Sequence, residues 1–165
     1  MIRSRLLQAA VGFGATAMFM ADATAEPRLL KRKVESGTPS VVGIGTRWNK
    51  ACASIGVPNV RIEIPPGNGF VCIRHGKVIP RHIIFGKGKQ CLDTEMDGVQ
   101  IIYQSRHEFS GMDSMTYTLK FPRGERTFTT RIAVTPTSRR SAGYDEMPHE
   151  RQKPGPAPEC AALVS

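Results

Sequence analysis

The chain has 165 residues, which is enough for one domain with a hydrophobic core and excludes two domains of ordinary size. Its 23 lysines and arginines outnumber 14 aspartates and glutamates, so the formal net charge is +9. A basic surplus of this kind favours acidic partners, such as acidic glycans, lipopolysaccharide, anionic lipid or nucleic acid, although it does not select a fold.

Residues 1–25 have the pattern of a secretory signal peptide. A positively charged start is followed by an apolar run over residues 6–21, and residues 23–25, Ala-Thr-Ala, supply the small side chains that a signal peptidase requires. The alternative is an uncleaved membrane anchor, but the apolar run is shorter than the roughly 20 residues that a spanning helix needs. We expect cleavage near Ala25 and a mature protein in the periplasm or outside the cell, without an integral membrane segment.

Two flanking segments border the predicted domain, which we place at residues 41–137. Residues 26–40 mix charge with proline, glycine and serine without a sustained period, so we interpret them as an exposed basic linker. Residues 138–165 contain four prolines and balanced charge, a composition that cannot pack a core and predicts a flexible tail.

Short runs rich in β-branched and aromatic residues predict the strands of the domain. They cover residues 41–45, 60–64, 70–73, 99–103, 115–121 and 127–134. Turn residues separate the runs, and no long segment after the predicted signal peptide has the 3.6-residue apolar period of a helix. The fold class expected is therefore all-β, with antiparallel strands in a sandwich.

The last predicted hairpin supplies the clearest core. Apolar and polar residues alternate over 115–121 and again over 127–134, so each strand has one face suited to burial. Burying one such side chain contributes about 1.5–3 kcal/mol. Asp113, four residues before Tyr117, fits the corner of an immunoglobulin-type sandwich, where a tyrosine hydroxyl bonds to upstream backbone. We therefore expect Asp113 and Tyr117 to have structural roles.

The segment GVQIIYQSRHEFSGMDSMTYTL at residues 98–119 resembles the signature of bacterial immunoglobulin-like or cadherin-like repeats. In that family an aromatic residue ends one strand, and a second aromatic six residues later precedes a Gly-x-Asp-Ser-aromatic-x-Tyr motif. The matching residues here are Tyr103, Phe109, Gly111, Asp113, Ser114 and Tyr117. Upstream, residues 66–71 resemble the family's Pro-x-Asn-Gly-x-Val hairpin entry, so the resemblance covers roughly residues 58–136.

The resemblance implies an immunoglobulin-like sandwich that acts as a noncatalytic structural or protein-interaction module of the bacterial envelope. The chain departs from the family pattern in four ways: Met115 replaces a phenylalanine, Gln104-Ser105 replaces a common Thr-Pro, the stretch over residues 74–91 is longer and more basic, and a single copy stands in place of a tandem array. Some relatives bind calcium, but no DxDxDG-type cluster occurs here. We predict neither a metal nor a cofactor.

Four cysteines follow the predicted signal peptide, and an even number in an exported protein suggests disulfide bonds. They are Cys52, Cys72, Cys91 and Cys160. The sequence itself leaves three pairings open. The family resemblance implies that Val71 and Ile73 point inward and Cys72 outward, where it could hold a returning tail through Cys160. Cys52 would then pair with Cys91.

The run RHGKVIPRHIIFGKGK at residues 74–89 is the strongest candidate for a binding site. Its cations could hold phosphate or sulfate groups, and Gly86 and Gly88 would let the backbone approach a ligand. The candidate residues are Arg74, Lys77, Arg81, Lys87 and Lys89. The alternative interpretation is a solvated hairpin whose charges prevent edge-to-edge pairing. Polyanion binding through this run is our alternative function.

No catalytic residues are predicted. The four histidines are scattered without an HxH or HExxH pattern, and the sequence neighbours His107 and Glu108 lack a nucleophile elbow. We therefore expect a noncatalytic protein rather than a hydrolase, without a small-molecule substrate, whose partner is an envelope protein or an acidic polymer of unknown identity.

Overall fold

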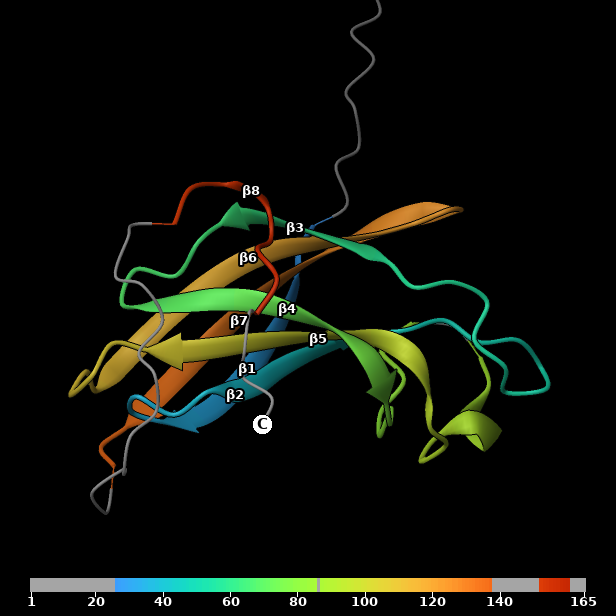
Figure 1. Cartoon of the computed structure of the whole chain (residues 1–165), viewed down its shortest axis with the longest axis horizontal. Coiled ribbons are helices and arrows are strands. Elements are labelled where there is room, and N and C mark those ends of the chain that lie inside the picture. The colour runs from blue at the N-terminus through green and yellow to red at the C-terminus, as the bar shows by residue number, and fades with distance from the viewer. Residues whose placement is uncertain (1–25, 86, 138–151, 161–165) are drawn as a thin grey trace, which may run out of the picture.

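The computed structural model describes residues 26–85, 87–137 and 152–160 (Figure 1). The predicted signal peptide, Gly86, residues 138–151 of the predicted tail and residues 161–165 lie outside this description. The elements are β1 (Arg28–Glu35), β2 (Ser40–Gly45), β3 (Asn59–Ile64), β4 (Gly69–Val78), the 3-10 turn η1 (Lys89–Cys91), β5 (Met96–Ser105), β6 (Gly111–Phe121), β7 (Gly124–Thr135) and β8 (Gly155–Pro156). The predicted all-β class is confirmed.

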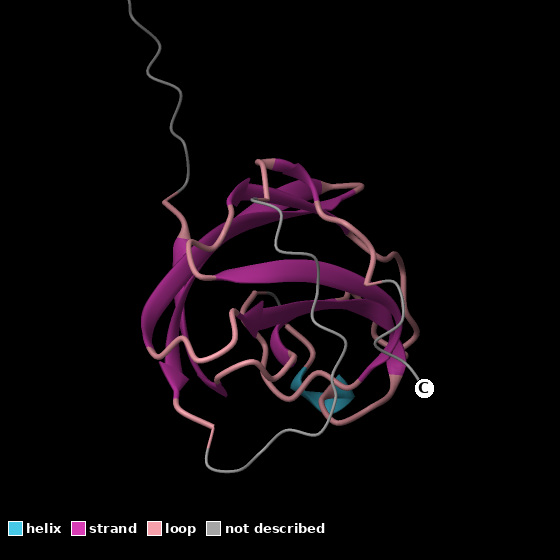
Figure 2. Ribbon diagram, turned by 60° about the vertical axis from the view of Figure 1, so that its left-hand side comes forward, coloured by secondary structure: helices cyan, strands magenta, loops and turns pink. Residues whose placement is uncertain are grey.

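Two sheets pack face to face as a sandwich. The larger sheet has the strand order β1-β7-β6-β3-β8, and the smaller sheet has the order β2-β5-β4. Their strands curve around a common interior, which the inner faces of both sheets fill (Figure 2). The short turn η1 lies outside this interior, beside a second small apolar cluster formed by Val78, Cys91 and Met96.

The β6–β7 hairpin supplies the centre of the core, as its alternating sequence predicts. Tyr117 lies opposite Phe128 in the register, and their rings stack with centroids 5.4 Å apart. On the other face of the hairpin, threonine hydroxyls form two cross-strand hydrogen bonds. The pairs are Thr116 with Thr129 at 3.0 Å and Thr118 with Thr127 at 2.9 Å. One face of the hairpin is thus packed by apolar contacts and the other is tied by hydroxyl pairs.

Strand β2 approaches the larger sheet closely because two of its residues are glycines. A Cβ at Gly43 would lie 2.5 Å from the Tyr117 hydroxyl oxygen, and one at Gly45 would lie 3.1 Å from a Leu119 methyl carbon, both in β6 of the larger sheet. Side chains at these two positions would push the sheets apart, so the sequence Gly-Ile-Gly fixes how near β2 lies to β6.

The predicted linker over residues 26–40 is wrong for Arg28–Glu35, which forms strand β1. This strand pairs in parallel with β7, whereas the other paired strands are antiparallel as predicted. Val34 is buried and Leu30 packs against the core. The run was not recognisable as a strand because arginines occupy two inward positions, 28 and 32, which removes the clean alternation of apolar and polar residues.

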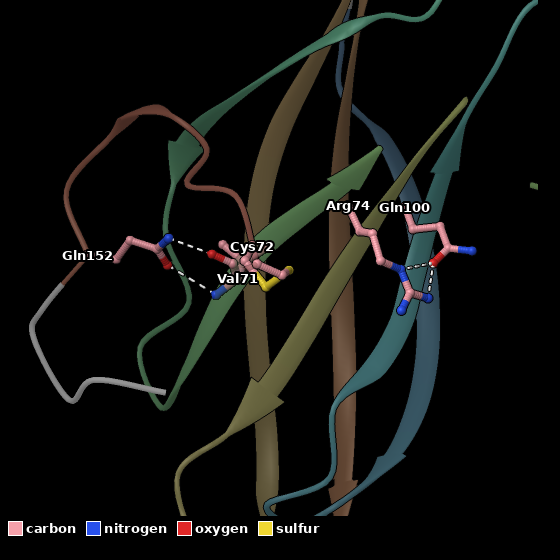
Figure 3. Close-up of a disulfide and its surroundings, with 6 residues drawn as sticks. Val71, Cys72, Arg74, Gln100 and Gln152 are labelled. Atoms are coloured by element: carbon pink, nitrogen blue, oxygen red, sulfur yellow. Dashed lines mark hydrogen bonds between the residues drawn. A yellow bond between two sulfur atoms is a disulfide. The ribbon is translucent and has the colours of Figure 1, made fainter. Parts of the chain in front are cut away.

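Residues 152–160 of the predicted flexible tail contact both sheets. Strand β8 pairs with β3, while the backbone N–H of Ile73 in β4 donates to the Pro158 carbonyl at 2.8 Å and the Cys160 N–H donates to the Ile73 carbonyl at 2.8 Å. The Gln152 carboxamide accepts from the Val71 N–H at 3.1 Å and donates to the Val71 carbonyl at 2.6 Å (Figure 3). This side chain takes the place of a neighbouring strand on the edge of β4.

The two disulfides confirm the pairing that the family resemblance implied. Cys52 bonds to Cys91 across 39 residues, and Cys72 bonds to Cys160 across 88 residues (Figure 3). Cys72 is almost completely buried, at 2% exposure, because the returning segment lies over it. The longer bridge therefore fastens residues 152–160 to β4.

We expect the double substitution Cys72→Ser/Cys160→Ser to lower the free energy of unfolding by about 2–4 kcal/mol, since it removes a long covalent loop from the unfolded chain. Cys52→Ser/Cys91→Ser should cost less, because its loop is shorter and it does not fasten residues 152–160. Urea denaturation of the oxidised proteins measures both values. The assignment fails if the shorter bridge contributes more than the longer one.

Candidate functional site

The five cations predicted to bind a polyanion do not form one site. Arg74 donates through Nε to the Gln100 side-chain oxygen at 3.0 Å and also through Nη2, on the outer face of the smaller sheet (Figure 3). Lys77 lies 2.7 Å from Asp97, whose hydrogen bond and charge raise the pKa of the lysine. Both cations therefore already have a partner within the chain.

The other three predicted cations lie elsewhere. Lys87 and Lys89 are exposed on either side of Gly88, which has a left-handed φ of 118° and packs against the Trp48 indole. A Cβ at Gly88 would lie 2.7 Å from Trp48 Nε1, so glycine is required there by both conformation and space. Only Arg81 of the five lines the cleft described next.

A cleft of about 650 Å³ opens beside β2, at the end of the sandwich where β6 turns into β7. Five arginines from four separate segments line it, and we call it the arginine cleft. They are Arg32, Arg47, Arg81, Arg123 and Arg126. Arg32 and Arg47 are half-buried, whereas the other three are exposed.

The surfaces between these arginines are largely apolar. Strand β2 forms one wall through residues 41–45, the segment at residues 79–85 forms another, and the ends of β6 and β7 contribute apolar side chains. Those side chains are Leu119, Phe121 and Phe128. A concave apolar surface with a few converging polar groups is the usual form of a ligand site.

Arginine side chains hold two walls of the cleft in place. Arg32 Nε donates to the Val42 carbonyl of β2 at 2.8 Å, which links the two sheets. Phe85 packs edge-on against Phe128 with ring centroids 5.8 Å apart, and the guanidinium carbons of Arg28 and Arg126 each lie 5.2 Å from the Phe85 ring centroid. Cation–π contacts thus fix the end of the segment at residues 79–85.

The arginine cleft carries an unbalanced positive charge. None of the described residues that line it is an aspartate or glutamate, and none of its arginines is paired with a carboxylate in the described part of the chain. Like charges held together raise one another's electrostatic energy, and a bound anion would lower it. Guanidinium groups also match the oxygens of carboxylates and phosphates in a two-pronged geometry.

Asp113 lies at a junction between the sheets rather than in the cleft. Its carboxylate accepts hydrogen bonds from the Gly67, Asn68 and Ser114 N–H groups at 2.8–3.0 Å, and from the Tyr103 hydroxyl at 2.9 Å. The corner is therefore built by the Asp113 carboxylate, which accepts from upstream backbone and from the Tyr103 hydroxyl of β5. Burial, followed by the charge of Asp113, raises the pKa of the Tyr103 hydroxyl.

Tyr117 has a different position, inside the core. Its ring stacks on Phe128, and its hydroxyl lies beside the Gly43 backbone. Burial raises the pKa of Tyr117 from 10.0 to about 12.

No family model, curated protein or solved structure matches the chain. The resemblance to immunoglobulin-like or cadherin-like repeats therefore stays a prediction. Within the described residues, no helix is long and apolar enough to cross a membrane, and no group of three His, Cys, Asp or Glu side chains could hold a metal ion.

Four arginines of the cleft were missed by sequence reasoning. Arg32 lay in the predicted linker and Arg123 in a predicted turn, while Arg47 and Arg126 stood apart from any basic run. These four arginines belong to no recognisable sequence motif. They line one cleft because β1 pairs in parallel with β7 and because residues 79–85 run beside β2.

Asp113→Asn should lower the free energy of unfolding by about 2–3 kcal/mol, because a carboxylate that accepts four hydrogen bonds becomes an amide with two donors of its own. Tyr103→Phe removes only one of the four bonds and should cost less. Urea denaturation of both variants at neutral pH tests the ranking, and a neutral Asp113→Asn substitution would contradict this role.

Alkaline pH should destabilise the protein through its buried tyrosines. A tyrosine whose pKa is higher in the folded state keeps its contribution below pH 10 and loses it as the pH rises from 10.0 toward about 12. A shift of this size corresponds to about 2–3 kcal/mol for Tyr117. Denaturation curves across this range should fall less steeply for Tyr117→Phe than for the wild type, with a remaining fall from Tyr103; identical slopes would show that Tyr117 does not contribute.

Proposed function

We propose that this protein is an exported, noncatalytic binding module of the bacterial envelope, and that the arginine cleft is the site at which it binds an anionic ligand. The observation that supports this proposal is the convergence of five arginines on one largely apolar cleft, with no aspartate or glutamate among its described lining residues. Charged groups that converge on a concave, otherwise apolar surface are typical of a ligand-binding site rather than of a surface that only contacts water.

Export and envelope location are supported by two independent features. The two disulfides, Cys52–Cys91 and Cys72–Cys160, suit an oxidising compartment, and residues 1–25 have the pattern of a signal peptide. The resemblance of residues 98–119 to immunoglobulin-like or cadherin-like repeats supports a noncatalytic role in the envelope, and belongs to the same proposal.

The proposed site differs from the basic run at residues 74–89. Arg74 and Lys77 have partners within the chain, and Lys87 and Lys89 do not line the cleft. An extended polyanion along that run is therefore less well supported than an anion that enters the arginine cleft.

Titration with the fluorescent anion anilinonaphthalene sulfonate tests the proposal. We expect saturable binding at low salt that weakens as salt screens the arginines. Arg81→Gln/Arg123→Gln should weaken binding roughly tenfold, the scale of losing one or two charge-assisted hydrogen bonds. The matched control is Arg61→Gln/Arg131→Gln, which removes the same charge from exposed strand positions that do not line the cleft.

Two results would contradict the proposal. One is equal weakening by the two double substitutions, which would show that binding follows net charge rather than the cleft. The other is the absence of saturable binding by the wild-type protein at low salt.

A further inference from the structure

The four edges of the two sheets differ in how they are protected against pairing with another strand. At one side of the larger sheet, β8 is only two residues long and contains Pro156, and at the other side β1 carries four basic residues. In the smaller sheet, residues 152–160 cover the edge of β4. Short length, proline, charge and coverage by another segment are the usual ways in which proteins protect edges.

No described strand pairs with the outer edge of β2, although a bulge between Val41 and Gly43 interrupts its pairing with β5. The sequence of β2, Ser-Val-Val-Gly-Ile-Gly, contains neither a charge nor a proline, and it leaves Val41 44% and Ile44 38% exposed. It pairs only with β5. An edge strand of this kind presents backbone N–H and C=O groups that are ready to pair with an incoming chain.

The contact of β2 with Arg32 shows how this edge is occupied. Among the described residues, the guanidinium of Arg32 is the only side chain that donates to a β2 backbone carbonyl on this side, at Val42. Val42 is the bulged residue of β2 and has no register partner in β5, so its carbonyl can accept from a donor outside the sheet, such as Arg32 or an added strand. An incoming peptide could take over the Val42 carbonyl and leave Arg32 free to bind a carboxylate.

The open edge of β2 and the positive charge of the arginine cleft lie side by side. Residues 41–45 of β2 line the arginine cleft, and the lining continues along the chain to Trp48. A strand added to β2 would therefore extend its side chains among the arginines and the apolar residues of the cleft.

We propose that the ligand is an extended, acidic peptide segment of a partner protein, bound as an added strand on β2. This inference rests on the proposed function and specifies its ligand class. Backbone hydrogen bonds to β2 supply sequence-independent affinity, while carboxylates that meet the arginines select an acidic segment. A second copy of β2 fits poorly, because it would bring its own arginine cleft against this one.

Isothermal titration of the oxidised full-length mature protein with a synthetic peptide, acetyl-Glu-Val-Glu-Val-Glu-Val-amide, tests this inference. Its first control has the same sequence with an N-methyl group on every residue, which keeps the charges and removes the backbone donors. Its second control replaces each glutamate with lysine. We expect the acidic peptide to bind, the methylated peptide to bind at least tenfold more weakly, and the lysine peptide not to bind.

Amide hydrogen exchange locates the contact. Saturating acidic peptide should slow exchange of β2 amides within residues 40–45 and leave β3, which is paired on both sides, unchanged. Arg81→Gln/Arg123→Gln should weaken the acidic peptide, whereas Arg61→Gln/Arg131→Gln should not.

The possible outcomes separate this inference from the proposed function. Equal binding of the acidic and methylated peptides would overturn strand addition while leaving an anion site in place. Displacement of anilinonaphthalene sulfonate by dodecanoate, with no displacement by the acidic peptide, would overturn it in favour of an acyl amphiphile. If anilinonaphthalene sulfonate itself does not bind, the proposed function fails together with the inference.

Discussion

The parallel pairing of β1 with β7 is the constraint on which the candidate site depends. The register places Arg32 beside Ile132, an inward-facing core residue, so the arginine points toward the smaller sheet and reaches the Val42 carbonyl of β2. A slip of one residue would exchange the two faces of β1, bringing Lys31 and Lys33 inward and moving Arg32 to solvent. Burial of Val34 and Leu30 on the same face opposes that slip, so the hydrophobic core fixes the position of the arginine.

The two sides of the sandwich are closed by different means. On one side, residues 152–160 pair with β3, bridge to β4 and are fastened by the Cys72–Cys160 disulfide. On the other side, consecutive strands β1 and β2 belong to different sheets and are joined by the side chain of Arg32 rather than by a backbone ladder. The side covered by residues 152–160 is held by a disulfide and by backbone pairing. The side between β1 and β2 is held by one side-chain hydrogen bond, which a competing donor could replace.

The parts of the fold that the sequence predicts are those in which a local pattern decides the structure. Residues 115–121 and 127–134 alternate cleanly, so their pairing and their buried face follow from period-two geometry. β1 escapes such reasoning because the arginines at positions 28 and 32 contact Ile84, Phe85 and Val42, which belong to other segments of the chain. The arginine cleft escapes it for the same reason, since its residues come from four segments that become neighbours only after folding.

Arginines on the inward-facing sides of β1 and β7 need a physical explanation, because an apolar side chain at the same position would stabilise the folded protein more. At Arg28 and Arg126 the Phe85 ring provides cation–π contacts, and at Arg32 the edge of β2 provides an acceptor. These contacts stabilise the guanidinium groups, but neither an aromatic ring nor a backbone carbonyl supplies a negative charge that neutralises them. The cations that cover an apolar edge therefore discourage indiscriminate pairing of that edge, and the same charge selects a carboxylate-bearing strand over any other.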